Sequence, residues 1–330
     1  MSQEAVQPSS EVSRPKGVLL LLIVAGILAL LRIGTAYASV TPSFAMVLSV
    51  VTTILFVAVP ILAIFRAASD AWTARLGFGL LAVGVAAHIG GVVLARYLLH
   101  DQGFLAVLLI ALAQSGLLLW CVALGALLAL LIKDKNLLLP VAIFLAGLDV
   151  FLVVAPIGLT KQIVEKNPEL FRSVAYAVPK VSTGPAPGVI MPMAFIGPAD
   201  FFFLAMFFVA LFRFHMRTGE TFRWIVPVLL AYLMVVMGFG SVQLGPISLA
   251  MLPALVPIGL TVMLVNRKEF RLAKDEKVAT IGVGVIALAL AGAGIWMSLR
   301  AAKEPTARSS IAVPERASSA PEPLSEGPPH

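Results

Sequence analysis

Long apolar runs recur along this chain and constrain its fold more than any other feature. Each run is close to or longer than the roughly 20 residues that an α-helix needs to cross a bilayer. Hydrophobic residues make up 60% of the 330 residues and charged residues only 12%, a balance that excludes a soluble globular domain. The sequence therefore predicts an all-α polytopic membrane protein.

Hydropathy predicts nine transmembrane helices between two polar tails. The predicted spans are 17–34, 43–65, 75–99, 103–132, 136–158, 189–213, 222–241, 246–266 and 278–299. Residues 1–16 and 301–330 are too polar to pack and are predicted to be disordered. The chain thus divides into four N-terminal helices over 17–132, a middle segment over 133–266 and one further helix over 267–300.

The first apolar run also has the pattern of a secretory signal. Basic residues precede a short apolar core, and Ala36-Tyr37-Ala38 resembles a small-residue cleavage site. Arg32 stands between that core and the site, which favours a retained helix. We expect a retained span, with a cleaved signal as the alternative.

The net charge of +7 does not indicate a nucleic-acid partner, because the basic residues lie between the spans. That distribution suits anionic lipid headgroups. Lys and Arg are more numerous on the N-terminal side of the predicted spans, which predicts a cytoplasmic N-terminus. The only cysteine, Cys121, excludes an intramolecular disulfide.

Asp149 and Asp200 are the only acidic residues in the middle of apolar stretches. A carboxylate at the centre of a bilayer costs roughly 2.5–3.5 kcal/mol or more, so such residues face protein or water and are candidates for function. Taken alone, Asp149 also fits a neutral acid bound to a neighbouring helix, and Ala146 and Gly147 would let such a helix approach closely.

Asp200 has a different alternative, because Gly197 and Pro198 precede it and Gly-Pro-x-Asp is also how a helix begins. Too few apolar residues separate Asp200 from Arg213 for a full crossing, however. The crossing must then include Val189–Ile196, which places Asp200 near the middle of the membrane.

Two carboxylates a few ångströms apart cannot both ionise, so they share one proton. The ionised member takes a proton from the water that attacks a peptide carbonyl, and the protonated member polarises that carbonyl or protonates the leaving amine. This chemistry needs no metal and no cofactor.

Three prolines, at 246, 253 and 257, interrupt the start of the eighth span. Prolines remove backbone hydrogen bonds, so this segment cannot continue as a regular helix. One interpretation is a kinked entrance to a transmembrane helix. The other is an opened backbone that offers carbonyl and amide groups to an extended substrate.

These elements, in this order, resemble the presenilin and signal peptide peptidase family of intramembrane aspartyl proteases, as a bacterial or archaeal type of member. That family carries Tyr-Asp, then Gly-x-Gly-Asp on the next span, then Pro-Ala-Leu. The matching segments here are Leu148-Asp149, Gly197-Pro198-Ala199-Asp200 and Pro253-Ala254-Leu255.

The resemblance covers roughly residues 137–266, so it implies a presenilin-like catalytic core over the middle segment. It implies that Asp149 and Asp200 are catalytic, and that the groove for the substrate includes Gly197 and Pro253-Ala254-Leu255. It also implies transmembrane segments of other proteins as substrates, no cofactor, and the cell (inner) membrane of a prokaryote. No oligomeric state follows from it.

Leu148 and Ala199 depart from the family pattern, and so does the helix over 267–300. A silent scaffold of the same fold is therefore an alternative, and a proton- or cation-coupled transporter that loads ions on the same carboxylates is another.

Smaller features give further predictions. Residues 174–178 and 189–191 are predicted to pair as a small β-hairpin between the two aspartate helices, which would present an edge strand to a substrate. His88 and Gln114, each inside an apolar run, are predicted to be hydrogen-bond partners between helices rather than proton relays.

Overall fold

The computed structural model of the protein is largely helical. It describes residues 16–100, 103–183, 188, 190–239, 242–244, 247–249 and 253–303, with the backbone alone for 236–239, 242–244, 247–249 and 303. The two predicted disordered tails lie outside these residues, apart from their innermost positions at 16 and 301–303.

An α-helix lies in each of the nine predicted spans. The helices are α1 (Lys16–Tyr37), α2 (Pro42–Ala68), α3 (Ala74–Val93), α4 (Gly103–Leu131), α5 (Leu138–Val154), α8 (Pro198–Arg213), α9 (Thr218–Phe239), α10 (Leu255–Asn266) and α11 (Lys274–Lys303). The shorter elements are η1 (Leu94–Leu98), η2 (Lys135–Leu137), α6 (Leu159–Lys166), α7 (Pro168–Val174), β1 (Tyr176–Pro179), β2 (Pro192–Ile196), β3 (Val242–Leu244) and β4 (Ile247–Leu249).

Within the described residues, six helical segments are long and apolar enough to cross a membrane. They are α1, α2, α3 with η1, α4, the segment from η2 through α6, and α11. The protein is therefore a helical membrane protein that crosses the bilayer several times. The count of nine crossings stays a prediction, since α8 has 16 residues and α10 only 12.

Two predicted helices begin later than expected. Within 189–213, residues 192–196 form β2 instead of helix, and α8 begins at Pro198. In 246–266, residues 247–249 form a strand and α10 begins at Leu255. Proline has no amide hydrogen and disfavours the helical conformation of the residue before it, so a helix starts at or after such a position. The interpretation of Gly-Pro-x-Asp as a helix start is confirmed.

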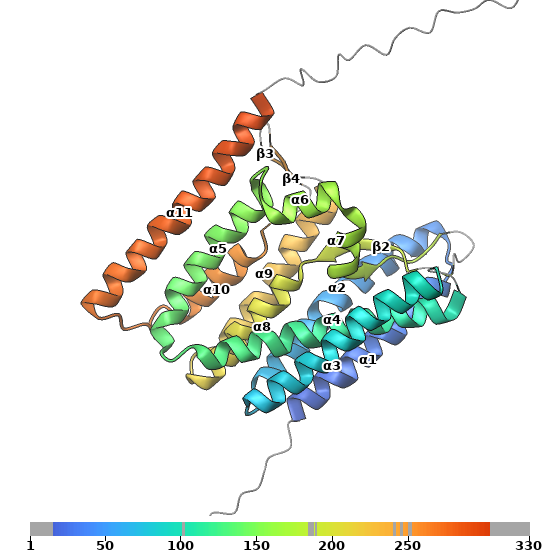
Figure 1. The fold of residues 1–330 in the computed structure, drawn as a ribbon, viewed down its shortest axis with the longest axis horizontal. Helices are drawn as coiled ribbons and strands as arrows, with labels where there is room; N and C mark the ends of the chain where they lie inside the picture. Colours follow the sequence, from blue (N-terminus) through green and yellow to red (C-terminus); the bar gives the residue numbers. More distant parts are fainter. Residues whose placement is uncertain are drawn as a thin grey trace, which may run out of the picture.

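The four N-terminal helices and the middle segment share one hydrophobic core rather than forming separate bodies. In Figure 1 the helices lie side by side, with α11 at one edge next to α5 and helices α1–α4 on the other side of α8. Arg213 at the end of α8 donates to the carbonyl oxygens of Ala129 (3.0 Å) and Ile132 (2.8 Å) at the end of α4. The Arg213 side chain of α8 thus supplies hydrogen-bond donors to carbonyl groups at the C-terminal end of α4, where carbonyls have no partner inside the helix.

Helix α1 is an integral part of this bundle. The Asp70 carboxylate, just beyond α2, accepts hydrogen bonds from the first amides of α1, Gly17 (3.1 Å) and Val18 (2.7 Å). Ser115 on α4 donates to the carbonyl of Ala25 at 2.7 Å. These contacts fix both the start and the middle of α1.

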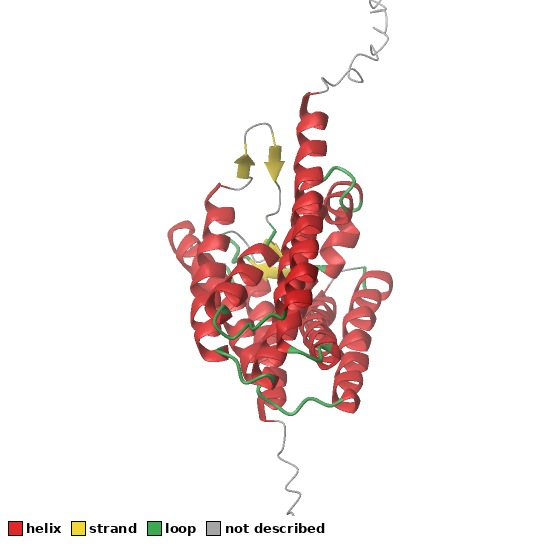
Figure 2. Cartoon of the chain, turned by 90° about the vertical axis from the view of Figure 1, so that its left-hand side faces the viewer, coloured by secondary structure: helices red, strands yellow, loops and turns green. Residues whose placement is uncertain are grey.

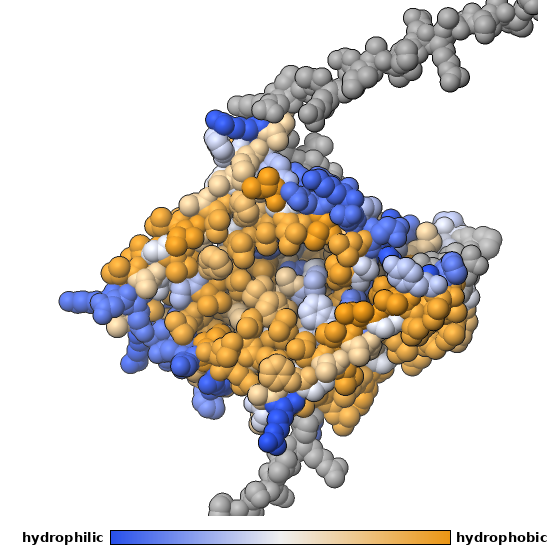
Figure 3. All heavy atoms as spheres, viewed as in Figure 1, coloured by the Kyte–Doolittle hydropathy of each residue, from blue (hydrophilic) through white to orange (hydrophobic). Residues whose placement is uncertain are grey.

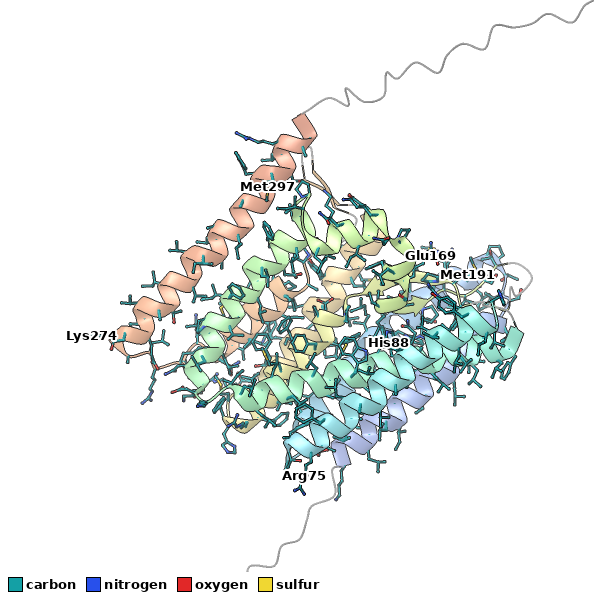
Figure 4. The ribbon with its side chains drawn as sticks, in the orientation of Figure 1. Arg75, His88, Glu169, Met191, Lys274 and Met297 are labelled. Carbon is teal, nitrogen blue, oxygen red and sulfur yellow. The ribbon has the colours of Figure 1, made fainter. Side chains whose placement is uncertain are left out.

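Apolar side chains cover most of the face in Figure 3, and polar ones gather toward two opposite ends of the helices. Exposed leucine, isoleucine, valine and phenylalanine residues lie along α1, α2, α3 and α11. Figure 4 shows Arg75 and Lys274 toward one end of the bundle and Glu169 toward the other. A lipid-facing belt between two polar ends is what a membrane-spanning bundle requires.

Two small antiparallel sheets interrupt the helices (Figure 2). In one, β1 pairs with β2 with Tyr176 opposite Ile196 and Val178 opposite Ala194. This confirms the predicted hairpin between the aspartate helices, although its second strand is 192–196 rather than 189–191. Residues 184–187 and 189, between the two strands, lie outside the described residues. In the other sheet, β3 pairs with β4 near the end of α11 (Figure 1).

His88 is an interhelical partner, as predicted: its Nδ1 lies 3.0 Å from the carbonyl oxygen of Ala113 on α4. Figure 4 shows His88 among the helices. Gln114, in contrast, binds a strand rather than a helix.

Helix α11 approaches α5 closely at Gly147, as the small residue predicts. A Cβ at this position would lie 2.5 Å from the carbonyl oxygen of Ala287 and 2.7 Å from its Cα, so the backbones would have to separate. We expect Gly147→Leu to lower the free energy of unfolding by about 1–3 kcal/mol through overpacking. Thermal unfolding in detergent measures this, with Gly282→Leu on α11 as control, because a Cβ there meets nothing within 4 Å. Equal losses for the two variants would contradict the close packing.

Candidate active site

Asp149 lies on α5 and is held by the start of α10. Its Oδ2 accepts a hydrogen bond from the backbone amide of Leu255 at 2.8 Å. Leu255 is the first residue of α10, where amides have no partner inside the helix and the helix dipole is positive. The Pro-Ala-Leu segment therefore reaches the first aspartate directly, through its backbone.

Asp200 occupies the third position of α8. Its Oδ2 accepts from the amide of Gly197 at 3.2 Å, and its own amide donates to the carbonyl of Gly197 at 3.1 Å. Pro198 between them suits the first turn of a helix, because it needs no amide partner. The local sequence thus fixes the carboxylate at the positive end of α8.

The two carboxylates lie close enough to interact electrostatically. Helix α10 contacts both α5 and α8 and so connects the two aspartate helices. Each carboxylate also lies at the N-terminus of a short helix, where backbone amides replace part of the solvation that the membrane removes. The structure therefore brings together the Asp149 segment, the Gly197–Asp200 segment and the Pro253–Leu255 segment.

A cavity of about 490 Å³ opens beside Asp200. Of the predicted site residues, Asp200, Gly197 and Ala254 line it, whereas Asp149, Pro253 and Leu255 are not among its lining residues. The rest of the lining is mostly apolar and comes from α2, α6, α7, β2, α8, α9 and α10. A cavity of this size and character accommodates apolar side chains next to a carboxylate.

Comparison with protein-family models, curated proteins and solved structures finds no match to this chain. Within the described residues, no three histidine, cysteine, aspartate or glutamate side chains gather as metal ligands.

Strand β1 has its outer edge covered by two side chains. Gln114 accepts from the amide of Ala177 at 2.8 Å and donates to the carbonyl of Ala175 at 3.1 Å. Arg32 donates to the carbonyl of Ala177 at 2.8 Å, and its guanidinium stacks on the rings of Phe56 and Tyr176. The backbone groups that β1 turns away from β2 are thus occupied.

Within the described part of the chain, no backbone group pairs with the outer edge of β2, and β2 lines the cavity. Both backbone groups of Ala177 point away from β2, so Ala177 and Phe195 form a non-hydrogen-bonded pair. In such a pair the amide and carbonyl of the second residue also point outward. The backbone of Phe195 therefore faces the side on which an extended peptide can add.

Sequence reasoning missed Tyr232, on α9. It lines the cavity together with Asp200. The only signal in the sequence is a phenol inside an apolar helix, which by itself does not distinguish a site residue from one packed at the membrane interface.

Proposed function

We propose that the protein is an intramembrane aspartyl endopeptidase that cleaves transmembrane segments of other membrane proteins. The observation that carries this proposal is the arrangement around α10: its first amide binds Asp149, and Asp149 interacts with Asp200 beside an apolar cavity. The family resemblance over residues 137–266 supports the same function. The proposed location is the cell membrane of a prokaryote, with the N-terminus in the cytoplasm and lipids around the apolar belt.

In the proposed mechanism, one carboxylate is ionised and the other protonated. The ionised carboxylate takes a proton from water as the water oxygen attacks the carbonyl carbon of the scissile bond. The protonated carboxylate hydrogen-bonds the carbonyl oxygen in the resulting tetrahedral species. Transfer of a proton to the nitrogen then breaks the carbon–nitrogen bond and leaves a carboxylic acid and an amine. Water is the only reactant besides the peptide.

Leu148 and Ala199 depart from the family pattern, but neither departure removes a carboxylate that the proposed mechanism uses. Ala199, in place of glycine, lies exposed at the start of α8, so its methyl group does not obstruct the packing of this helix. Leu148 removes a tyrosine ring but leaves the Asp149 carboxylate bound to Leu255. We therefore propose that the protein is an active enzyme rather than a catalytically silent scaffold.

The decisive experiment incubates the purified protein in liposomes with a labelled transmembrane peptide, alongside Asp149→Ala and Asp200→Ala. We expect cleavage by the wild type and none by either variant. Proton flux across the same liposomes is measured in parallel. Aspartate-dependent flux without cleavage would replace the proposal by a transporter, and neither activity would favour the scaffold.

If a substrate binds as an added strand on β2, Phe195→Pro should weaken substrate binding without disrupting the hairpin. Proline is tolerated at a strand position whose amide faces outward, so pairing with β1 should persist while the donor for substrate is lost. We expect KM to rise by about 10-fold relative to Phe195→Ala, a difference of about 1.4 kcal/mol that is within the range for one hydrogen bond. The alanine variant is the matched control, because it also loses the ring contact with Phe171 but keeps the amide. Equal KM values for the two variants would contradict strand addition at this residue.

A further inference from the structure

The hydroxyl of Tyr232 is buried and has no hydrogen-bond partner among the described residues. A buried hydroxyl without a partner is destabilising, and such a group in a native protein calls for an explanation from its surroundings. The phenol ring lies within an otherwise apolar stretch of α9, where phenylalanine would fill the same space. Because Tyr232 lines the cavity, a ligand bound there can supply the missing hydrogen-bond partner of this hydroxyl.

The surroundings of Tyr232 identify where that ligand lies. Tyr232 lines the same cavity as Asp200, Gly197 and Ala254. It forms no hydrogen bond with either carboxylate. Of the four tyrosines in the chain, at 37, 97, 176 and 232, only this one lines the cavity. Its hydroxyl is thus next to the proposed reacting groups but is not used by them.

We infer that Tyr232 is a further catalytic residue, whose hydroxyl donates a hydrogen bond to the carbonyl oxygen of the scissile bond. This inference rests on the proposed function. As water adds to the carbonyl carbon, negative charge develops on that oxygen, and a donor already placed in an apolar cavity stabilises it without reorganisation. The tyrosine keeps its proton throughout, and proton transfer stays with the two carboxylates.

The role also accounts for a departure in the sequence. Leu148 leaves the residue before Asp149 without a hydroxyl, and Tyr232 on α9 places a phenol in the cavity that Asp200 lines. The hydroxyl has no partner among the described residues, and in the complex it gains one from the substrate. Such an arrangement lowers the stability of the free protein and stabilises the transition state.

The test compares Tyr232→Phe with Tyr176→Phe in the cleavage assay. Both changes remove a buried hydroxyl that has no partner among the described residues, but Tyr176, which contacts Arg32 and Phe201, does not itself line the cavity. We expect Tyr232→Phe to lower kcat by about 10²-fold, as for loss of one donor to a developing oxyanion, with KM changed less than about threefold. Tyr176→Phe should retain the wild-type kcat. The melting temperature of Tyr232→Phe should equal or exceed that of the wild type, because an unpartnered hydroxyl is removed.

Each other outcome has a distinct meaning. If the wild type cleaves in an aspartate-dependent way and both tyrosine variants match it, the role of Tyr232 is overturned while the protease stands. A rise in KM alone, or a fall in kcat that follows a lowered melting temperature, also overturns a catalytic role, since it shows binding or folding instead. If wild-type protein does not cleave, the proposed function fails and this inference fails with it.

Discussion

Replacing either Asp149 or Asp200 with asparagine is expected to lower kcat by about 10³-fold or more. Asparagine keeps the size of the side chain and one carbonyl oxygen, so it can still accept from the Leu255 amide at position 149 or from the Gly197 amide at position 200. It cannot exchange the shared proton, and general acid–base groups each contribute about 10²–10⁴-fold to rate. The loss should therefore be chemical rather than structural.

The double variant Asp149→Asn with Asp200→Asn distinguishes a true pair from two separate sites. Groups that act as one unit are strongly non-additive, so the double variant should be about as inactive as either single one. Asp134→Asn is the matched control, because Asp134 accepts from the amide of Asn136 at 2.8 Å at an exposed helix start. Initial rates with a fluorogenic transmembrane peptide give the comparison. Substantial activity in either single variant, with intact folding, would exclude the shared-proton mechanism.

Replacing Gln114 with leucine is expected to lower the free energy of unfolding by about 2–4 kcal/mol. The carbonyl of Ala175, just before β1, and the amide of Ala177 within β1 lose their partner, and each unsatisfied buried group costs about 1–3 kcal/mol. Two such groups together would cost about 2–6 kcal/mol. Ala175 is fully buried but Ala177 only partly, so we expect a loss of about 2–4 kcal/mol, in the lower part of this range. We also expect cleavage to decrease, because β1 supports the strand that lines the cavity.

Thermal and denaturant unfolding in detergent measure the stability of Gln114→Leu. Gln162→Leu on α6 is the control, since the Gln162 side chain makes no hydrogen bond to the described part of the chain. This control should change stability by less than about 0.5 kcal/mol. A Gln114→Leu variant as stable as the wild type would show that water or Arg32 replaces the lost contacts.

Much of this arrangement is predictable from local sequence alone. Apolar runs predict the helices because a bilayer accepts only backbones whose hydrogen bonds are internally satisfied. Gly197 and Pro198 predict the start of α8 because the physics of a helix N-terminus is local. The β1–β2 hairpin was predicted but its second strand was displaced by a few residues, since strand register depends on partners distant in the sequence.

Other features depend on residues that are far apart in the chain. Nothing near Gln114 or Arg32 indicates that both would bind β1, more than 60 residues away in sequence. The burial of Arg32 follows from two aromatic rings on other elements. Tyr232 was missed for the same reason, because its significance lies only in the neighbours that packing gives it.

The sequence by itself determined that the chain spans a membrane, and that two carboxylates within its apolar stretches, Asp149 and Asp200, mark the candidate site. Hydropathy and the cost of a buried charge suffice for both conclusions, because each depends on single residues and their immediate neighbours. Only the tertiary structure decided that the first amide of α10 binds Asp149, that β2 lines the cavity, and that Tyr232 lines it together with Asp200. Hydrogen bonds and electrostatic contacts act over a few ångströms, so they depend on packing between helices rather than on spacing along the chain.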